Sequence, residues 1–443
     1  MFFGFFLSKN ENYWNYDTYV YHNVAKMVAN GHGIKNMDGS NHFYRVPGYS
    51  LFLSFFYKLF NDTDIKNFLW VQVFFASFIP VLLFILSLIL FSTDLLLAKL
   101  VSIFSIFHLG YILFSGLALT ESFFTIFFLL FCILFLPNLH LFFCLNFNLN
   151  IKLKKMFLAG IFLGIASLIR PVGHHLIIGL LFLLLTLKND WRKKLKLCLF
   201  LFSGWFLIVF GWLLRNWLLT GYIFFHTLPG IHFLKHSAAI ILMKANQCDY
   251  VTSLNFLTKQ CDDIKAVKEQ KKINSLNAIE YCNVMQEVSL NCFFSYPFLT
   301  VQHFLINIFK TCFSLYSAEL LFIDSVENLP KYDLNRSWKN IFLRFLIPNT
   351  SNKFFIFLIY MEILFFVFLW IGFLGFVVNS FFDFELLCLL VKTVVISGIL
   401  IFLTIACGFA RLRLPIEPFL IILSFKFWVQ FFFRKKRVLW MKS

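Results

Sequence analysis

Apolar stretches long enough, or nearly long enough, to cross a bilayer as helices recur along the chain after residue 64, separated by short polar breaks. The predicted spans are, in chain order, Ile65–Phe91, Leu95–Phe114, a span from Leu119–Ser122 to about Leu136, Met156–Ile169, Leu176–Leu187, Leu197–Leu214, Phe354–Val378, Leu386–Cys407 and Leu414–Phe433. Met1–Leu7 is apolar but too short to span, and we expect it to be the end of a truncated first helix. The pattern predicts an all-α polytopic membrane protein with about ten visible transmembrane helices.

Two polar segments interrupt this pattern. In the first segment, after Asp17, apolar positions recur at helical spacing, and Leu51–Phe60 is a second short apolar stretch. Both predict amphipathic helices that lie at a membrane interface. The predicted organisation is a transmembrane module over residues 1–217 that contains the polar loop 8–64, a largely polar extracytoplasmic region over residues 218–352, and C-terminal transmembrane helices over residues 353–443.

The composition excludes a soluble protein. Hydrophobic residues make up 60% of the 443 residues and charged residues only 14%, which is more apolar material than a soluble domain needs. The net charge of +17 is compatible with nucleic-acid binding, but the densest basic runs flank apolar spans, as the positive-inside rule requires. We therefore expect no nucleic-acid partner, and we expect the runs Lys152–Lys155, Arg192–Lys196 and Arg434–Arg437 to face the cytoplasm.

Counting spans from these basic runs places the loop 8–64, the region 218–352 and several charged span ends on the opposite, extracytoplasmic face. The charged residues at these span ends are Glu121, Arg170, Arg215 and Arg411. Ionisable residues at membrane depth are unfavourable, so their default interpretation is functional. Arginine at three outer span ends predicts an anionic ligand at headgroup level, with a lipid phosphate or pyrophosphate as the natural candidate.

Several of these residues have more than one interpretation. Asp17 either caps the helix that it begins or acts as a catalytic base or metal ligand. Arg45 either pairs with Asp17 or binds a phosphate, for which a planar guanidinium suits better than an ammonium group. Glu121 either interacts with the dipole of the helix that it opens or supplies a second acid.

Cysteines and histidines give weaker signals. Five of the ten cysteines lie in the polar region 218–352, where one or two disulfides could form if that region is extracytoplasmic. These five are Cys248, Cys261, Cys282, Cys292 and Cys312. The pair His174–His175 lacks a third ligand, so it is weak support for a metal site. No cofactor is predicted with certainty, and a divalent metal at Asp17 stays open.

A set of short motifs occurs in a characteristic order. They are the acidic Asp17, then Arg45-x-Pro-Gly-Tyr49, Leu-Thr-Glu-Ser over 119–122, Ala-Gly-Ile-x-Leu-Gly-Ile-Ala-Ser-Leu-Ile-Arg-Pro over 159–171, Gly-Trp-x-x-Arg-Asn-Trp over 211–217, and Arg-x-x-Leu-Pro-x-x-Pro over 411–418. In this order, over roughly residues 10–220 and 385–430, the chain resembles the GT-C fold glycosyltransferases of the family 39 type. That group includes protein O-mannosyltransferases, the lipid A aminoarabinose transferase and bacterial lipopolysaccharide-core transferases.

The resemblance implies a multi-pass enzyme of the cell membrane, most naturally a bacterial inner membrane. The enzyme would transfer a sugar, with inversion, from a polyprenyl-phosphate donor to an extracytoplasmic lipid-linked glycan, lipid A or protein. Asp17 would correspond to the base, and the donor phosphate would meet Arg45, Arg170, Arg215 and Arg411. Further candidates for substrate binding, or for a second acid, are Glu121, Tyr44, Tyr49 and His174. Many members carry Asp-Glu in the first loop, whereas Thr18 follows Asp17 here.

Two other functions stay open. An O-antigen ligase-like or polymerase-like enzyme also uses outer arginines and a large external loop, but would not need a carboxylate in the first loop. A lipid-linked sugar flippase or transporter is expected to show inverted repeats and charges at mid-membrane depth. The sequence shows no such repeat, and its charges cluster at one face. An inactive relative that keeps the fold is a third alternative.

Overall fold

The computed structural model describes residues 16–91, 94–140, 149–186, 190–270, 277–317, 353–402 and 405–434. Within these ranges the chain is helical, and its β-structure is a single isolated bridge between Lys35 and Asn41. The prediction of an all-α protein is therefore confirmed. The predicted truncated helix Met1–Leu7, Cys144, and most of the second half of region 218–352 lie outside the described residues.

Two short helices at the start of the described chain occupy the two segments that are predicted to be amphipathic helices. Helix α2 (Tyr16–Ala29) and helix α3 (Gly48–Phe60) pack against each other. Gly31 and Gly33 follow α2 with φ angles of 82° and 79°, a conformation that favours glycine and stops the helix. The loop between the two helices carries Arg45 and therefore returns this side chain toward the start of α2.

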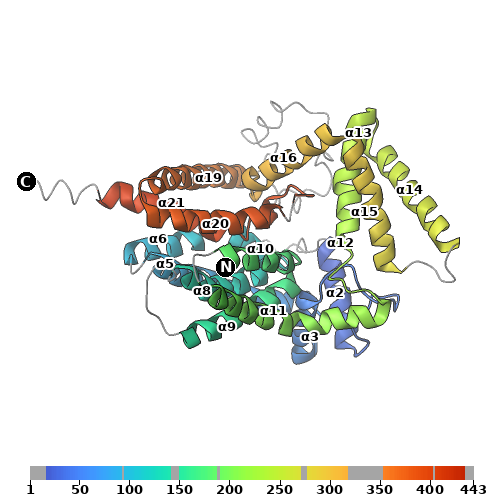
Figure 1. The fold of residues 1–443 in the computed structure, drawn as a ribbon, viewed down its shortest axis with the longest axis horizontal. Coiled ribbons are helices and arrows are strands. Elements are labelled where there is room, and N and C mark those ends of the chain that lie inside the picture. The colour runs from blue at the N-terminus through green and yellow to red at the C-terminus, as the bar shows by residue number, and fades with distance from the viewer. Residues whose placement is uncertain are drawn as a thin grey trace, which may run out of the picture.

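The remaining helices fall into an N-terminal set and a C-terminal set that share one hydrophobic core. The N-terminal set comprises α4 (Ile65–Ala76), α5 (Ile79–Leu90), α6 (Leu95–Ile106), α7 (Leu109–Gly116), α8 (Glu121–His140), α9 (Leu149–Ile169), α10 (Val172–Thr186) and α11 (Trp191–Thr220). The C-terminal set comprises α19 (Lys353–Ser380), α20 (Phe384–Phe402) and α21 (Glu417–Val429). In Figure 1 the C-terminal helices run above the N-terminal ones, along the same horizontal direction.

Four helical segments are long and apolar enough to cross a membrane, or up to six if each of two bent pairs counts as one span. The four are Ile65–Leu90, Trp191–Thr220, Ile356–Ser380 and Phe384–Phe402. The chain is thus a multi-pass membrane protein, with fewer full-length spans in its described part than the sequence predicts. One reason is a bend of 48° between α6 and α7, which interrupts the predicted span Leu95–Phe114.

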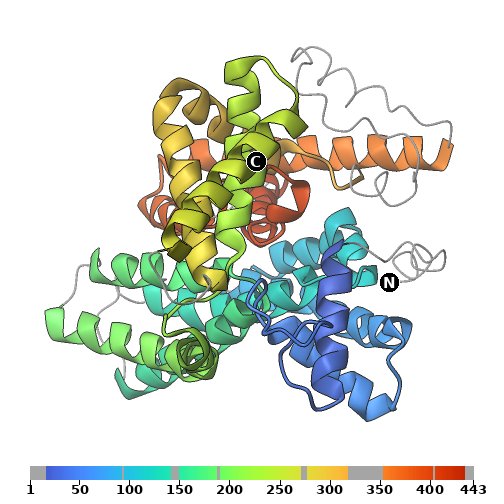
Figure 2. The same cartoon turned by 90° about the vertical axis from the view of Figure 1, so that its right-hand side faces the viewer.

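The segment after α11 forms a second, separate hydrophobic core. Its elements are α12 (Leu228–Ile231), the π-helix η2 (His232–Ala238), α13 (Ala239–Asn246), α14 (Tyr250–Gln270), α15 (Ala278–Ser295) and α16 (Pro297–Phe313). Figures 1 and 2 show α13, α14 and α15 standing across the direction of the long helices, at one end of them. Within this largely polar region, α15 and α16 together are as apolar as a membrane span, although they meet at 109°.

Glycines explain how closely α9 and α11 pack. A Cβ atom on Gly160 would lie 2.2 Å from the carbonyl oxygen of Leu201, and one on Gly204 would lie 2.1 Å from that of Phe157. Small residues spaced by four, as in Gly160 and Gly164, let helix backbones approach in membranes. Gly160 faces Leu201 and Gly164 faces Ile208, so the two helices run parallel and both C-terminal ends lie at the same end of the bundle.

Candidate functional site

The centre of the site is the carboxylate of Asp17, in the first turn of α2. One of its oxygens accepts a short hydrogen bond from Nη2 of Arg45, and the other accepts from Nη1 of Arg411 at 3.2 Å. Asp17 is only 8% exposed. Three residues far apart in the sequence therefore form one cluster around a buried carboxylate, which we call the Asp17 cluster.

The charge state of Asp17 follows from its neighbours. Burial alone would raise the pKa of this carboxyl, but the positive charges of Arg45 and Arg411 outweigh burial and leave the pKa below its ordinary value. Asp17 is therefore ionised at neutral pH. Because both of its oxygens accept from arginines, the surroundings favour an added anion over a metal cation.

The backbone before α3 fixes the position of Arg45. His42 accepts a hydrogen bond from the Arg45 backbone N–H through Nε2 at 3.0 Å, and its Nδ1 lies 2.7 Å from Oδ1 of Asn36. Since Nε2 accepts, Nδ1 carries the proton and the ring is neutral. Burial, with the charges of Arg215 and Arg45, lowers the pKa of His42 to about 4, in agreement with a neutral ring.

Gly48 lets the same loop approach the end of α9. A Cβ atom at this position would lie 2.5 Å from the carbonyl oxygen of Leu168. No side chain fits in that space, so the approach requires glycine. Because Leu168 lies two residues before Arg170, this contact holds the loop of Arg45 next to the loop of Arg170.

A second ion pair lies beside the Asp17 cluster. Arg170, just after α9, approaches the carboxylate of Glu121 at 3.3 Å, and Glu121 is buried as the first residue of α8. Tyr21 of α2 lies under the guanidinium of Arg45, whose carbon is 5.8 Å from the ring centroid. Burial raises the pKa of the Tyr21 phenol, and the charges of both ion pairs also influence this pKa. The predicted residues Asp17, Arg45, Arg411, Glu121 and Arg170 are thus brought together.

Hydrogen bonds brace the backbone that carries Glu121. The Tyr49 hydroxyl donates to Oε1 of Gln72 at 2.8 Å, and Nε2 of Gln72 donates to the carbonyl oxygens of Phe114, Ser115 and Leu117. Thr18 also donates to the carbonyl oxygen of Ala118 at 3.2 Å. Tyr49 is fully buried in this arrangement, so the structure places it in support of the site and away from any ligand surface.

Arg215 lies outside the two ion pairs. Its guanidinium donates to the carbonyl oxygens of Ile34 at 2.8 Å and His42 at 3.3 Å, and to Oδ1 of Asn216 at 2.9 Å. The group also lies over the rings of Phe43 and Trp212. These contacts anchor the loop between α2 and α3 to the end of α11, so Arg215 positions the loop of Arg45 in this structure.

The other two predicted substrate-binding residues have different surroundings. The Tyr44 ring lies under the guanidinium of Arg45, 5.1 Å from its carbon. The His174 ring stacks on Phe225 at a centroid distance of 4.1 Å and is close to His175. Tyr44 therefore belongs with the Asp17 cluster, whereas His174 packs among aromatic rings.

Two guanidinium groups each have a buried N–H donor that makes no hydrogen bond within the described residues. Nε of Arg45 and Nη1 of Arg170 are buried and have no hydrogen-bond acceptor among the described residues. The approach of Arg170 to Glu121 is therefore a charge contact without the alignment of a hydrogen bond. Buried donors without acceptors are unfavourable, and a bound anion that accepted from either arginine would remove that cost.

Basic residues lie at the ends of the long helices that are far from the Asp17 cluster, and the sequence predicts that these ends face the cytoplasm. Lys154 and Lys155 near the start of α9, and Arg192 and Lys193 at the start of α11, are exposed. Lys426 in the second half of α21 pairs with Asp94, the N-cap of α6, at 3.2 Å. The Asp17 cluster and the basic ends thus lie at opposite ends of the bundle.

All five cysteines of the region 218–352 are free thiols, so the structure forms no disulfide among them. Sequence reasoning gave no role to Tyr21 or His42, which are now seen to support the cluster. It also missed His232, His236 and Cys407, whose ligand atoms lie within 4.8 Å of one another. The spacing of two histidines four residues apart was a signal for the first two, whereas only the tertiary structure adds Cys407.

No protein family and no curated protein matches the sequence. Among solved structures, the archaeal oligosaccharyltransferase AglB from Archaeoglobus fulgidus, in complex with an inhibitory peptide and a dolichol-phosphate, matches with a TM-score of 0.49 and 12% identity. The match covers 96% of this chain and 48% of that one, so this chain spans about half of the AglB length. ArnT from Cupriavidus metallidurans, in the apo state, matches with a TM-score of 0.34 and 11% identity over 93% of this chain and 72% of that one. Both TM-scores are below one half, so the chemistry of this chain has to be argued from its own residues.

Proposed function

We propose that this chain is a membrane glycosyltransferase of the GT-C type, which moves a sugar from a polyprenyl-phosphate donor to an extracytoplasmic acceptor. The observation that carries the proposal is the Asp17 cluster with its neighbouring pair, Glu121 and Arg170. Two carboxylates and three arginines meet at one end of the bundle, and two of these arginines have a buried donor with no acceptor among the described residues. The order of the sequence motifs supports the same reaction.

Each residue has a role that follows from its chemistry. The donor phosphate becomes a better leaving group when cations stabilise the charge that develops on it, and Arg45, Arg411 and Arg170 are placed for that task. Asp17 accepts the proton of the acceptor hydroxyl or amine as the new bond to the sugar forms. The acceptor attacks opposite the departing phosphate, so the configuration at the sugar carbon inverts.

Donor binding also changes the basicity of Asp17. With two arginines on its oxygens, the carboxylate is held at a low pKa and is a weak base. A phosphate that draws Arg45 and Arg411 toward itself weakens their hold on Asp17 and raises its pKa. The arginines thus couple occupancy of the phosphate site to activation of the base, which limits proton transfer to the state in which the donor is bound.

The test separates binding from chemistry. Purified protein in lipid vesicles is incubated with polyprenyl-phosphate sugars and cell-envelope lipids, and transfer is followed by mass spectrometry. Asp17→Asn is expected to bind polyprenyl phosphate but to lose about 100-fold or more of the transfer rate, the usual contribution of a general base. Arg45→Gln is expected to weaken polyprenyl-phosphate binding about tenfold or more, because a charge-assisted hydrogen bond is lost.

Arg192→Gln is the matched control, because it removes an exposed arginine from the opposite end of the bundle and should leave both measurements unchanged. Transfer by Asp17→Asn at the wild-type rate would exclude Asp17 as the catalytic base and would favour a ligase-like enzyme. Donor binding and movement across the vesicle membrane without transfer would favour the flippase.

A further inference from the structure

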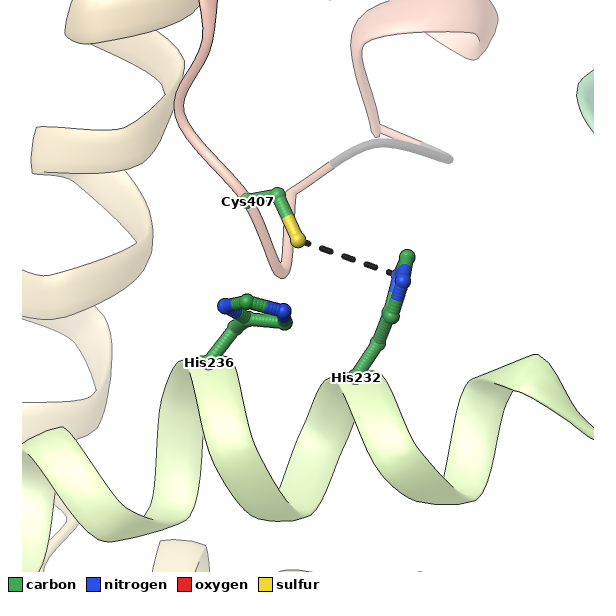
Figure 3. Close-up of side chains that lie close together, drawn as sticks. All are labelled: His232, His236 and Cys407. Carbon is green, nitrogen blue, oxygen red and sulfur yellow. Dashed lines mark hydrogen bonds between the residues drawn. The ribbon is translucent and has the colours of Figure 1, made fainter. Parts of the chain in front are cut away.

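The segment next to the Asp17 cluster holds a second group of chemically reactive side chains. His232 and His236 project from the same side of η2, and Cys407 comes from the loop between α20 and α21 (Figure 3). One ring nitrogen of each histidine and the sulfur of Cys407 lie within 4.8 Å of one another. Nδ1 of His232 is 3.8 Å from the Cys407 sulfur, and the two imidazole rings are 5.3 Å apart between centroids.

These distances fit a small metal ion after minor side-chain rotation. Zinc binds imidazole nitrogen at about 2.0–2.1 Å and thiolate sulfur at about 2.3 Å. In a tetrahedral arrangement these bond lengths put a nitrogen and a sulfur ligand about 3.6 Å apart. The distance between His232 and Cys407 is already close to that value.

The backbone around the three residues is held in place independently of any ion. Ser237 of η2 donates to the carbonyl oxygen of Ala406 at 3.3 Å, and Asn307 of α16 donates to that of Ile405 at 3.0 Å. A Cβ atom on Gly408 would lie 2.8 Å from the Cβ of Lys310, so the loop also packs tightly against α16. The residues on both sides of Cys407 are therefore fixed against η2, which carries both histidines, and against α16.

We propose that His232, His236 and Cys407 bind one zinc ion, with a fourth coordination position left for water or a ligand. Two imidazoles and a thiolate are a donor set that favours zinc over magnesium or calcium, which prefer oxygen ligands. The site is distinct from a carboxylate-held metal at Asp17. It fastens η2 to the loop that continues to Arg411, four residues after Cys407, and so positions Arg411 against Asp17.

The chemistry of His232 and Cys407 agrees with this assignment. Burial, with the charges of His236, Arg45 and Arg411, lowers the pKa of His232 to about 3, so its imidazole is neutral and able to ligate. Burial raises the pKa of the Cys407 thiol to about 12, and a bound zinc ion would draw off this proton. Zinc binding therefore releases one proton per ion.

The test measures the metal and does not depend on turnover. Protein purified with zinc sulfate present, then freed of loose ions on a desalting column, is expected to contain about one zinc per chain by plasma mass spectrometry. Cys407→Ser and His236→Asn should each lower zinc affinity more than about tenfold, since losing a ligand exceeds the effect of losing an outer-shell partner. Cys248→Ser and His32→Asn, which remove a partly exposed thiol and an exposed histidine, are the matched controls and should keep the ion.

Cobalt substitution identifies the sulfur ligand. The cobalt-loaded wild type should show a near-ultraviolet thiolate-to-cobalt absorption band, which Cys407→Ser removes. Cys407→His restores a third nitrogen ligand, so it should keep the ion without the band. A monodisperse wild type that stays free of zinc, or variants that bind zinc as tightly as the wild type, would overturn the site. Neither result depends on whether the protein transfers a sugar.

Discussion

At the scale of single residues, Asp17 shows how the surroundings choose between two interpretations of one carboxylate. The sequence left open whether Asp17 caps a helix or takes part in chemistry. In the structure its oxygens accept from Arg45 and Arg411, 28 and 394 residues away, and it lies within α2, after the first helical residue. A carboxylate that held its helix only as a cap would not need two arginines from distant parts of the chain.

The ionised Asp17 is expected to stabilise the fold in a manner that depends on pH. Its folded pKa is depressed, so its contribution is present above the ordinary value of 3.8 and is lost as the pH falls through the folded pKa. Asp17→Asn should lower the free energy of unfolding by about 3 kcal/mol at neutral pH, because it leaves Arg45, which is largely shielded from solvent, and Arg411 without their counter-charge. The difference from the wild type should shrink below pH 3.8, as measured by thermal unfolding in detergent.

Asp38→Asn is the control for this series. Asp38 is exposed in the loop between α2 and α3, and its carboxylate accepts only from Ser40 among the contacts that the structure records. Its substitution should change the unfolding temperature little at any pH. An Asp17→Asn variant that is as stable as the wild type at neutral pH would show that the arginines do not depend on this carboxylate.

At the scale of helices, glycines allow α9 and α11 to pack closely in parallel, so that their C-terminal ends lie next to each other. The run that begins at Ala159 contributes to the family resemblance, and its glycines have a structural reason. Gly160 and Gly164 let α9 lie against α11 backbone to backbone, with Gly204 on the facing side. The parallel contact brings the ends of α9 and α11, with Arg170 and Arg215, to one end of the bundle. Sequence reasoning recognised the motif but gave no partner for it.

Two glycine substitutions on α11 are expected to act in opposite directions. Gly204→Ala places a methyl group 2.1 Å from the carbonyl oxygen of Phe157, so the helices must move apart, at a cost of about 1–3 kcal/mol. Gly211→Ala, on the same helix, meets nothing within 4 Å and should stabilise the protein by about 0.5–1 kcal/mol. Thermal unfolding of both variants checks this, and equal unfolding temperatures would exclude the close contact.

At the scale of the whole molecule, charge separates the two ends of the bundle. The Asp17 cluster and the pair of Glu121 and Arg170 lie at one end, and exposed basic residues lie at the other. The positive-inside rule assigns the basic end to the cytoplasm. The region that follows α11 has its own core and is attached at the end of the Asp17 cluster, where η2 approaches Cys407. The sidedness of the site is thus a prediction from charge alone.

Cysteine labelling in whole cells tests this orientation. Lys154 near the start of α9 and Lys259 on α14 are both exposed, so each is replaced by cysteine in turn. A membrane-impermeant maleimide is expected to label Lys259→Cys in intact cells and Lys154→Cys only after lysis. The unsubstituted chain gives the background from its own thiols. Labelling of Lys154→Cys in intact cells, with Lys259→Cys protected until lysis, would invert the assignment and place the Asp17 cluster in the cytoplasm.

The sequence by itself determined that this is a helical membrane protein, because apolar runs of that length cannot stay soluble, and the placement of basic runs divided its charged residues between two ends. The sequence also predicted that Asp17, Arg45 and Arg411 are site residues on the same face of the membrane. Only the tertiary structure decided that these three contact one another and that Arg215 instead binds the carbonyls of Ile34 and His42. Helical periodicity and charge are local properties of the chain, whereas the choice among several arginines depends on how helices hundreds of residues apart pack.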